Sequence, residues 1–224
     1  MGHIGTYVPI DISADVLHAT AIDLRHRYPF LSVEPVVGDF LNPARLPERL
    51  SSVPKTGFFP RSTLGNVSPD DAQHLLSRVL AWPNVDAFVL GVDLIKDPCV
   101  LVQAYDDRAG VTAKFISDIL VRLNTELNAT FDLSGFTYEA KWNAALARIE
   151  MALISTGSQA AMLGDQAISF QAGERVAISQ SRKYTAETLG DLANAARWRI
   201  GEWITDTENQ LSVVVSRPRQ GRNT

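Results

Sequence analysis

The chain of 224 residues has a single cysteine, Cys99, which excludes an internal disulfide and any metal site built from several cysteines. One cysteine also fits a reducing compartment, and we expect a cytoplasmic protein. Basic residues are not in excess, because 21 lysines and arginines stand against 25 acidic residues. The net charge of −4 gives nucleic acid no electrostatic attraction, so we expect no nucleic-acid partner.

Metal-ligand spacing and long apolar runs are absent as well. The four histidines are scattered without ligand spacing, so we expect no metal ion; they are His3, His18, His26 and His74. No basic flank followed by an apolar run opens the chain, which predicts no signal peptide. The longest apolar run, around 87–95, is too short to span a bilayer and carries Asp93. We expect no membrane partner, and we expect a monomer.

Several catalytic fingerprints are also missing. The chain has no G-x-S-x-G nucleophile elbow and no Walker phosphate loop. No glycine-rich dinucleotide fingerprint precedes Asp11, which argues against a nucleotide-binding oxidoreductase. The serine-hydrolase and P-loop classes are therefore disfavoured.

Two short, β-branched apolar runs near the start each lead to a carboxylate. Thr6–Ser13 (TYVPIDIS) contains Asp11, and Val33–Leu41 (VEPVVGDFL) contains Asp39. Open α/β sheets bind ligands outside the carboxyl ends of their strands, where a carboxylate can accept both hydroxyls of a ribose. A carboxylate in that position can equally cap a helix. Two of them on consecutive strands favour a nucleoside site.

The first ninety-odd residues alternate predicted strands and helices. Strands at Tyr7–Ile12 and Val33–Val37 enclose a helix at Ala14–Tyr28, with Ser13 as its N-cap. The apolar stripe of this helix comprises Val16, Ala19, Ala21, Leu24 and Tyr28. A strand at Lys55–Pro60 and a helix from Pro69 to Leu80 follow.

Val85–Ile95 (VDAFVLGVDLI) is the clearest strand in the sequence. Its near-continuous apolar run is typical of a parallel strand buried on both faces. Together with the alternating elements before it, this strand predicts an α/β, doubly wound sheet.

The pattern changes after Asp97–Pro98. Two helices, about Cys99–Asp106 and Val111–Asn128, precede short strands, while Ala140–Ile149 fits either helix or strand. Turns are predicted at the glycines 157, 164 and 173. A helix at Ala186–Ala196 and a strand near Leu211–Val215 end the pattern. We expect a core at 1–96, a substrate-binding lobe at 97–180 and a return to the core at 181–224.

Further polar residues fit a site at the strand ends, each with an alternative. Asp39 and Phe40 suit an adenine. A carboxylate can accept a hydrogen bond from the adenine amine, and an aromatic side chain can stack on its ring. Asp93 faces a substrate or caps a turn, and Asn66 holds a substrate carboxylate or serves a Gly-Asn turn. The stretch around Tyr105 does not by itself decide whether this residue binds a ligand or is an exposed tyrosine of a helix. From the residues themselves we infer a nucleoside-binding α/β enzyme.

Taken in order, a series of blocks resembles one family closely. The blocks are YVPIDIS, GDFL, FFPRSTLGN, LGVDLIKD, AYDDRAGVTAKF, LNTEL, RIEM and S-x-S-x-KY. They resemble the histidine-specific S-adenosylmethionine-dependent methyltransferases, which trimethylate the α-amine of histidine in ergothioneine biosynthesis. The resemblance implies a Rossmann-like class I methyltransferase sheet with an inserted α+β substrate-binding lobe. It also implies S-adenosylmethionine as methyl donor, no metal, and a small amino acid as substrate.

The resemblance also implies a role for individual residues. Asp11 would bind the ribose hydroxyls of S-adenosylmethionine, and Asp39 with Phe40 would hold its adenine. Asn66 and Tyr105 would orient the carboxylate and α-amine of the amino acid, so no residue acts as acid, base or nucleophile. Met151 would line the side-chain pocket, where Ser181 would hydrogen-bond the imidazole.

The chain departs from the family pattern in four places. The family's first strand and Gly-rich loop, with a substrate-binding tyrosine, would lie upstream of Met1. Ser179 stands where the family has a glutamate that reads the imidazole, and a serine accepts other side chains more readily. Arg61 replaces a glycine and Ile116 an asparagine. An alternative interpretation is therefore a truncated, non-catalytic remnant, or a fragment whose start was assigned too late.

Overall fold

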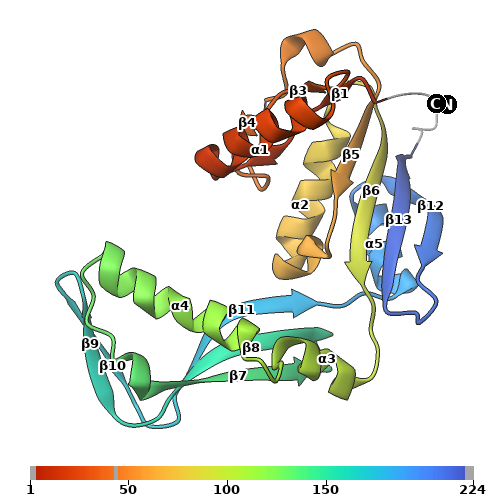
Figure 1. Cartoon of the computed structure of the whole chain (residues 1–224). Helices are drawn as coiled ribbons and strands as arrows, with labels where there is room; N and C mark the ends of the chain where they lie inside the picture. The colour runs from red at the N-terminus through yellow and green to blue at the C-terminus, as the bar shows by residue number, and fades with distance from the viewer. Residues whose placement is uncertain (1–3, 43–44, 220–224) are drawn as a thin grey trace.

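The longest strands outside the lobe form a four-stranded main sheet in the order β12-β13-β6-β5, in a computed structural model that describes residues 4–42 and 45–219 (Figure 1). These strands are β12 (Trp198–Thr205), β13 (Leu211–Pro218), β6 (Val85–Asp93) and β5 (Lys55–Phe59). β5 and β6 run parallel, and β13 is antiparallel to both β6 and β12. The predicted α/β architecture is confirmed, with a sheet that includes the parallel pair β5–β6. β12 was not predicted, because Arg199 and Glu202 interrupt its apolar pattern.

One face of the main sheet is covered by helices. α2 (Pro69–Leu80) and α5 (Ala186–Ala195) pack against each other and against this face. The buried side chains beneath them include Leu90 of β6, Val214 of β13 and Trp198 of β12, each 0% exposed. The indole N–H of Trp198 donates to the carbonyl oxygen of Leu76 at 2.8 Å, which ties β12 to α2.

The opposite face of the main sheet has no helix over it among the described residues. Its cross-strand neighbours Phe58, Val89 and Val215 lie in one row, and Val213 and Ile204 in the next. Phe58 is 63% exposed, and Val213 is 44% exposed. The prediction that β6 is covered on both faces is therefore wrong for the described chain. The continuous apolar run makes both faces of β6 apolar, but only one of them meets helices.

Residues 4–42 form a separate part of the structure, called here the N-terminal unit. β1 (Thr6–Tyr7) pairs in parallel with β3 (Ser32–Val33), and β2 (Ile10–Asp11) pairs in parallel with β4 (Val36–Val37). Each predicted strand is split in two at a proline, Pro9 or Pro35, since proline has no N–H to donate to a sheet. Carbonyl oxygens still accept across the break, as Pro9 does from Val36 N–H at 2.9 Å.

α1 (Ala14–Arg27) lies against these strands and ends two residues before Pro29, close to its prediction. Ser13 is its N-cap but makes no side-chain capping bond; the Ser13 N–H donates to Asp11 instead. Of the predicted apolar stripe, Ala21 is buried, Leu24 is half-buried, and Val16, Ala19 and Tyr28 are exposed. The stripe prediction fails because the short strand pairs offer α1 too small a surface to cover it.

Few described contacts join the N-terminal unit to the main sheet. The Phe40 ring packs edge-on against Phe59 of β5, with centroids 5.2 Å apart. Glu34 pairs with Arg49 of the short 3-10 helix η1 (Glu48–Leu50). β5 pairs only with β6 among the described residues, so its other edge, toward the N-terminal unit, has no strand partner.

A lobe follows β6 and contains α3 (Pro98–Tyr105), α4 (Val111–Glu126) and the 3-10 helix η3 (Leu133–Gly135). Its antiparallel lobe sheet has the order β11-β8-β7. The strands are β7 (Phe136–Asn143), β8 (Arg148–Ser155) and β11 (Arg175–Arg182). Ala140–Ile149, left open by the sequence, spans the end of β7, a turn and the start of β8.

A hairpin of β9 (Gln159–Leu163) and β10 (Gln166–Phe170) extends the lobe. The predicted glycine turns are present: Gly164 (φ +58°) joins β9 to β10, and Gly173 (φ +79°) joins β10 to β11. Both need the left-handed backbone that glycine adopts without strain. Buried residues of α3 and α4, among them Leu101 and Leu120, cover one face of the lobe sheet. Ile116, where the family has an asparagine, is 3% exposed in this core.

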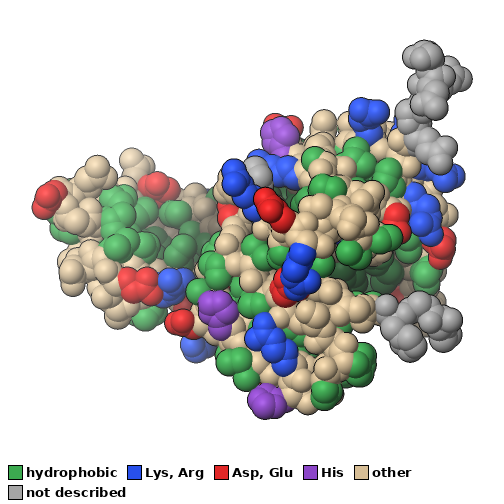
Figure 2. All heavy atoms as spheres, turned by 90° about the horizontal axis from the view of Figure 1, so that it is seen from above, with side chains coloured by type: hydrophobic (Ala, Val, Ile, Leu, Met, Phe, Trp, Pro, Cys, Tyr) green, Lys and Arg blue, Asp and Glu red, His purple; other side chains and the backbone are tan. Residues whose placement is uncertain are grey.

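The lobe lies at the carboxyl end of β6, and β11 returns from it to the main sheet (Figure 1). Seen from above, the lobe projects from the rest of the molecule and shows hydrophobic side chains on its surface (Figure 2). On α4, Val111, Phe115 and Ile119 are exposed at helical spacing. Among the described residues, no helix has both the length and the apolar character needed to cross a bilayer.

Candidate functional site

Asp11 is the last residue of β2, and Asp39 follows the end of the neighbouring parallel strand β4 by two residues. Asp11 stands opposite Val37 in the register, and its carbonyl oxygen accepts from Gly38 N–H at 3.0 Å. The Asp11 side chain is exposed, and its Oδ1 accepts from Ser13 N–H at 2.8 Å. Oδ2 has no hydrogen-bond donor among the described residues. Asp11 thus shapes the entry to α1 while one carboxylate oxygen stays available to a ligand's hydroxyl.

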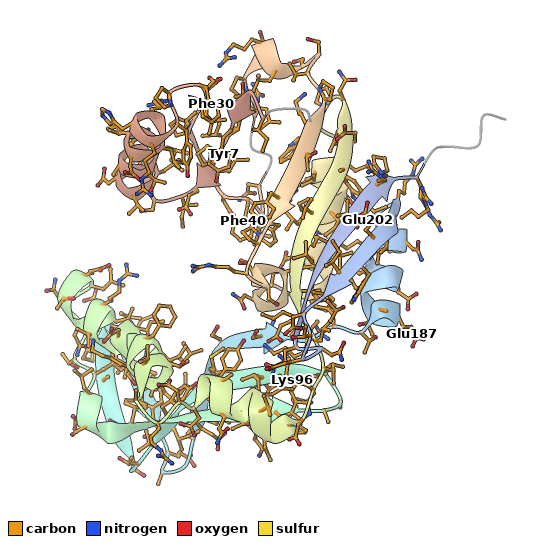
Figure 3. The ribbon with its side chains drawn as sticks, turned by 45° about the vertical axis from the view of Figure 1, so that its right-hand side comes forward. Tyr7, Phe30, Phe40, Lys96, Glu187 and Glu202 are labelled. Atoms are coloured by element: carbon orange, nitrogen blue, oxygen red, sulfur yellow. The ribbon has the colours of Figure 1, made fainter. Side chains whose placement is uncertain are left out.

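Asp39 is more engaged in its own turn. Its Oδ1 accepts from Leu41 N–H at 2.8 Å, and its Oδ2 accepts from the side-chain amide of Asn42 at 2.7 Å. Each carboxylate oxygen has two lone pairs, so both keep capacity for one further donor such as an amine. The neighbouring Phe40 is half-buried against Phe59, at the edge of β5 (Figure 3). The two carboxylates fit the hydroxyl and amine groups of a nucleoside.

The loop after β5 carries Asn66 and makes the joint between main sheet and lobe. The loop enters the 3-10 helix η2 (Thr63–Asn66) through Arg61 and Ser62, both at positive φ. A Cβ on Gly65 would stand 2.4 Å from the carbonyl oxygen of Arg182, so only glycine lets η2 approach β11 this closely. Asn66 is exposed beside this joint, and its side-chain amide has no partner among the described residues.

Tyr105 and Ser181, from α3 and β11, meet in the lobe. The Tyr105 hydroxyl donates to Ser181 Oγ at 2.8 Å. The Tyr138 hydroxyl donates to the Tyr105 carbonyl oxygen at 2.8 Å and so fixes the end of α3 on β7. Burial, with a smaller contribution from the nearby Asp106 carboxylate, raises the pKa of Tyr138 to about 12. Tyr138 therefore remains a neutral donor throughout the neutral pH range.

Met151 and Ser179 stand opposite each other in the β8–β11 register. Met151 is 5% exposed, whereas Ser179 is exposed. Ser181 stands next along the strand pair, opposite Ile149, on the same face of the lobe sheet. Met151, Ser179 and Ser181 thus line one strip of the face that α3 covers.

Asp93, at the end of β6, is held by ion pairs, and its carboxylate makes no turn-capping bond to a backbone N–H among the described residues. Its Oδ2 pairs with Lys183 Nζ at 2.7 Å, and its Oδ1 pairs with Lys96 Nζ at 2.6 Å. Its backbone N–H donates to Ser62 Oγ at 2.8 Å. Lys96 lies at the junction of lobe and main sheet (Figure 3). Asp93 therefore anchors that junction through two lysines and a loop serine.

The structure brings the predicted residues together in two groups. Tyr105, Met151, Ser179 and Ser181 share one face of the lobe sheet, and the loop of Asn66 touches the same β11, where the Gln180 side chain donates to the Val67 carbonyl oxygen at 3.4 Å. Asp11, Asp39 and Phe40 form the second group, which no hydrogen bond or ion pair of the described residues joins to the first. Sequence reasoning missed Lys183. The sequence pattern that could have identified Lys183 is the spacing of residues 179, 181 and 183, because alternate residues of a strand lie on the same face.

The described residues contain no group of three or more His, Cys, Asp or Glu side chains that could hold a metal ion. His3 lies outside them. The candidate residues include the exposed carboxylate of Asp11, the half-buried carboxylate of Asp39, an amide and hydroxyls, which are hydrogen-bonding groups for a polar ligand.

A model of the family described as "Histidine-specific methyltransferase, SAM-dependent" matches residues 2–218. The chain is 38% identical over 223 residues to histidine N-alpha-methyltransferase of Mycobacterium tuberculosis, covering 96% of this chain and 67% of that protein. It is 36% identical over 218 residues to the protein of the same name from Mycolicibacterium smegmatis, covering 94% and 66%. The chain therefore spans about two thirds of the length of both relatives.

A solved S-adenosylmethionine-dependent methyltransferase from Clostridium acetobutylicum aligns over 95% of this chain and 75% of its own, with a TM-score of 0.49 and 12% identity. The family assignment depends instead on the match to the family model and the two curated relatives. On that evidence, the chain belongs to the histidine-specific, S-adenosylmethionine-dependent methyltransferase family.

Proposed function

We propose that this protein is an S-adenosylmethionine-dependent N-methyltransferase that acts on the α-amine of L-histidine or a related amino acid, in a reaction of the ergothioneine-biosynthesis type. The observation that carries the proposal is the clustering of Tyr105, Ser181 and the Asn66 loop at the carboxyl end of β6. In open α/β sheets this is the end where ligands bind. The family match over residues 2–218 favours this enzyme over a non-catalytic remnant.

Asp11 and Asp39 would bind the nucleoside of the methyl donor. The Oδ2 atom of Asp11, which lacks a described donor, would accept from the ribose hydroxyls. Asp39 keeps lone pairs for the adenine amine, and the exposed edge of Phe40 would face the base. S-adenosylmethionine supplies a sulfonium-bound methyl group to the reaction.

The protein's contribution to the chemistry would be orientation. The amine nitrogen must be neutral and in line with the breaking carbon–sulfur bond; as the new nitrogen–carbon bond forms, the amine loses a proton to solvent. Asn66 can donate to a carboxylate and Tyr105 can orient the amine, so neither needs to exchange a proton with the substrate. Correct placement of two reactants supplies a large part of such a rate enhancement.

The amino acid's side chain would lie along the strip of Met151, Ser179 and Ser181. Met151 supplies a buried apolar wall, and Ser181 a hydroxyl. Ser179 places a short, exposed hydroxyl where the family has a longer acid. This hydroxyl would accept the side chain of histidine and those of related amino acid substrates. We infer that residues 97–180 form the substrate lobe and that 1–96 and 181–224 form the core.

Turnover tests the proposal directly. The protein is incubated with S-adenosylmethionine and a panel of amino acids, and S-adenosylhomocysteine is measured. We expect product with histidine or a close relative. Absence of product with every amino acid in the panel would overturn the activity for this chain.

Cofactor binding is tested separately by calorimetry with S-adenosylhomocysteine. Asp11→Ala and Asp39→Ala should each weaken binding about tenfold, since each removes a charge-assisted hydrogen bond. Asp23→Ala is the matched control, because Asp23 is an exposed acid in the second half of α1, where it pairs with Arg27. Equal affinities in all four proteins would contradict the nucleoside site even if turnover were observed.

A further inference from the structure

Lys183 is the most deeply buried charged side chain among the described residues, with a side-chain exposure of 0%. Its ammonium group lies 2.7 Å from Asp93 Oδ2, 2.7 Å from the Tyr105 hydroxyl oxygen and 3.0 Å from Ser181 Oγ. A lysine ammonium has three N–H donors, so each has one acceptor. Burying a charge is costly unless it is paired in this way, so the placement of Lys183 calls for a role.

Lys183 determines the direction of the Ser181 hydroxyl. Ser181 Oγ accepts one hydrogen bond from Lys183 and another from Tyr105. A serine oxygen has two lone pairs, and both are occupied. The hydroxyl hydrogen of Ser181 must therefore point to a third group. In this cluster Ser181 presents only a donor to a ligand.

Lys183 also fixes Tyr105. Its ammonium group donates to the phenol oxygen and lies 4.5 Å from the centroid of the same ring. The Tyr105 hydrogen is committed to Ser181, which leaves one lone pair on the phenol oxygen. Tyr105, which is half-buried, can thus offer a ligand an acceptor, and Ser181, which is 3% exposed, can offer it only a donor.

We propose that Lys183 is a positioning residue that sets Ser181 as a hydrogen-bond donor and Tyr105 as an acceptor, and so selects amino acids whose side chain presents an acceptor nitrogen. The proposal depends on the proposed function, because the selected ligand is the amino acid substrate. A neutral imidazole presents one such nitrogen, whereas a benzene ring of similar size presents none. A ligand with a benzene ring would leave the buried Ser181 hydroxyl without an acceptor, and this unpaired donor would weaken its binding.

Lys183 does not act as a proton acceptor in this arrangement. An ammonium with three donated hydrogen bonds has no lone pair, and Asp93 balances its charge. The same carboxylate also pairs with Lys96, which donates to neither Tyr105 nor Ser181. Lys96 therefore provides a matched control for the loss of a cation from Asp93.

The experiment compares Lys183→Met with Lys96→Met. Methionine keeps the length and apolar stem of lysine without its donors. Lys183→Met should raise KM for histidine about tenfold or more and lower the preference for histidine over phenylalanine, with affinity for S-adenosylhomocysteine unchanged. Lys96→Met should leave KM for histidine within about twofold of wild type, because Lys96 donates to Asp93 and not to Tyr105 or Ser181. Equal loss in both variants, or an unchanged preference in Lys183→Met, would overturn the proposal.

A double-mutant cycle tests whether Lys183 acts through Ser181. Ser181→Ala should itself lower the histidine preference, and adding Lys183→Met should lower it little further. If the two substitutions lowered the histidine preference independently, so that their effects multiplied in the double variant, Lys183 would not act through Ser181. Circular dichroism and thermal unfolding establish that each variant folds.

Crystal structures of the wild type and Lys183→Met separate this inference from the proposed function. Loss of the lysine should let the Tyr105 and Ser181 side chains rotate apart from their 2.8 Å hydrogen bond. An unchanged pair would contradict the role of Lys183 whatever the substrate proves to be. Absence of histidine turnover in the wild type, with rotation in the variant, would contradict only the substrate.

Discussion

The main sheet and the lobe sheet each have one face covered by helices, and they differ in the chemistry of the other face. The open face of the lobe sheet is charged: Glu150 accepts from Arg148 and Asn143, and Arg175 pairs with Glu139 and Glu150. The open face of the main sheet is largely apolar: it carries Phe58, Val213 and Ile204, with the exposed Glu202 opposite Val215. A charged face is already suited to water, whereas a contiguous exposed apolar face is typical of a contact surface.

The two ends of the proposed site also differ, in how tightly their residues are packed. The amino acid end lies where the lobe meets the end of β6, and Tyr105, Ser181, Lys183 and Asp93 hold one another there by short hydrogen bonds. The nucleoside end lies in the N-terminal unit, whose strands are two residues long and whose apolar side chains are largely exposed. Because the nucleoside end has few buried contacts, it can open locally at a low free-energy cost. The amino acid end is therefore the more rigid of the two.

The sharpest comparison uses two adjacent valines of β13 that point to opposite faces. Val214→Ala should lower the free energy of unfolding by about 2 kcal/mol, because Val214 is 0% exposed beneath α2 and α5. Val213→Ala should cost about 0.5 kcal/mol or less, because Val213 is already 44% exposed. Urea unfolding measures both. Equal costs would show that the apolar face is covered in solution.

Gly65→Ala should come next in size. Its new Cβ would stand 2.4 Å from the Arg182 carbonyl oxygen, so η2 and β11 must separate. We expect a loss of about 1–2 kcal/mol and weaker amino acid binding, since Asn66 moves with η2. Gly157→Ala is a fitting control, because nothing lies within 4 Å of a Cβ there. An unaffected Gly65→Ala protein would show that η2 and β11 can separate freely.

Arg61→Gly should stabilise the chain. Arg61 has φ +61°, in the left-handed region that glycine adopts without strain. Relief of that strain should raise the free energy of unfolding by up to about 1 kcal/mol, partly offset by the greater freedom of glycine in the unfolded chain. Thermal unfolding provides the measurement. A clear loss of stability would mean that the Arg61 side chain contributes more than its backbone costs.

The smallest effect concerns the charged face of the lobe sheet. Hydrogen bonds from Arg148, with further ones from Asn143, hold the pKa of Glu150 below its usual 4.5. The folded state therefore favours the carboxylate, and this stabilisation is present above pH 4.5 and is lost as pH falls through the lowered pKa.

Glu150→Gln should consequently flatten the dependence of stability on pH below about pH 4.5, by less than about 1 kcal/mol. Glu202→Gln, at an exposed position of β12 on the main sheet (Figure 3), is the control. A pH profile of Glu150→Gln that parallels the wild type would show that the ion cluster adds nothing.

Local patterns predicted most of the regular elements. Pro69 with its acidic first turn begins α2 where expected, and glycines mark the lobe turns. Patterns failed where a residue's neighbours come from distant segments. Val16 repeats as a helix stripe should, but it is 65% exposed, because periodicity says which side chains share a face and not whether anything covers that face.

The candidate site divides in the same way. The sequence by itself determined the family, the carboxylates at the strand ends and the set of polar residues proposed for the amino acid. Only the tertiary structure decided which of them touch: Lys183 reaches Asp93, Tyr105 and Ser181 because β6, α3 and β11 converge at one corner. Local alternation places Lys183 on the same side as Ser181, but its proposed role arises from burial among partners up to 90 positions away, and no local pattern encodes contacts over that distance.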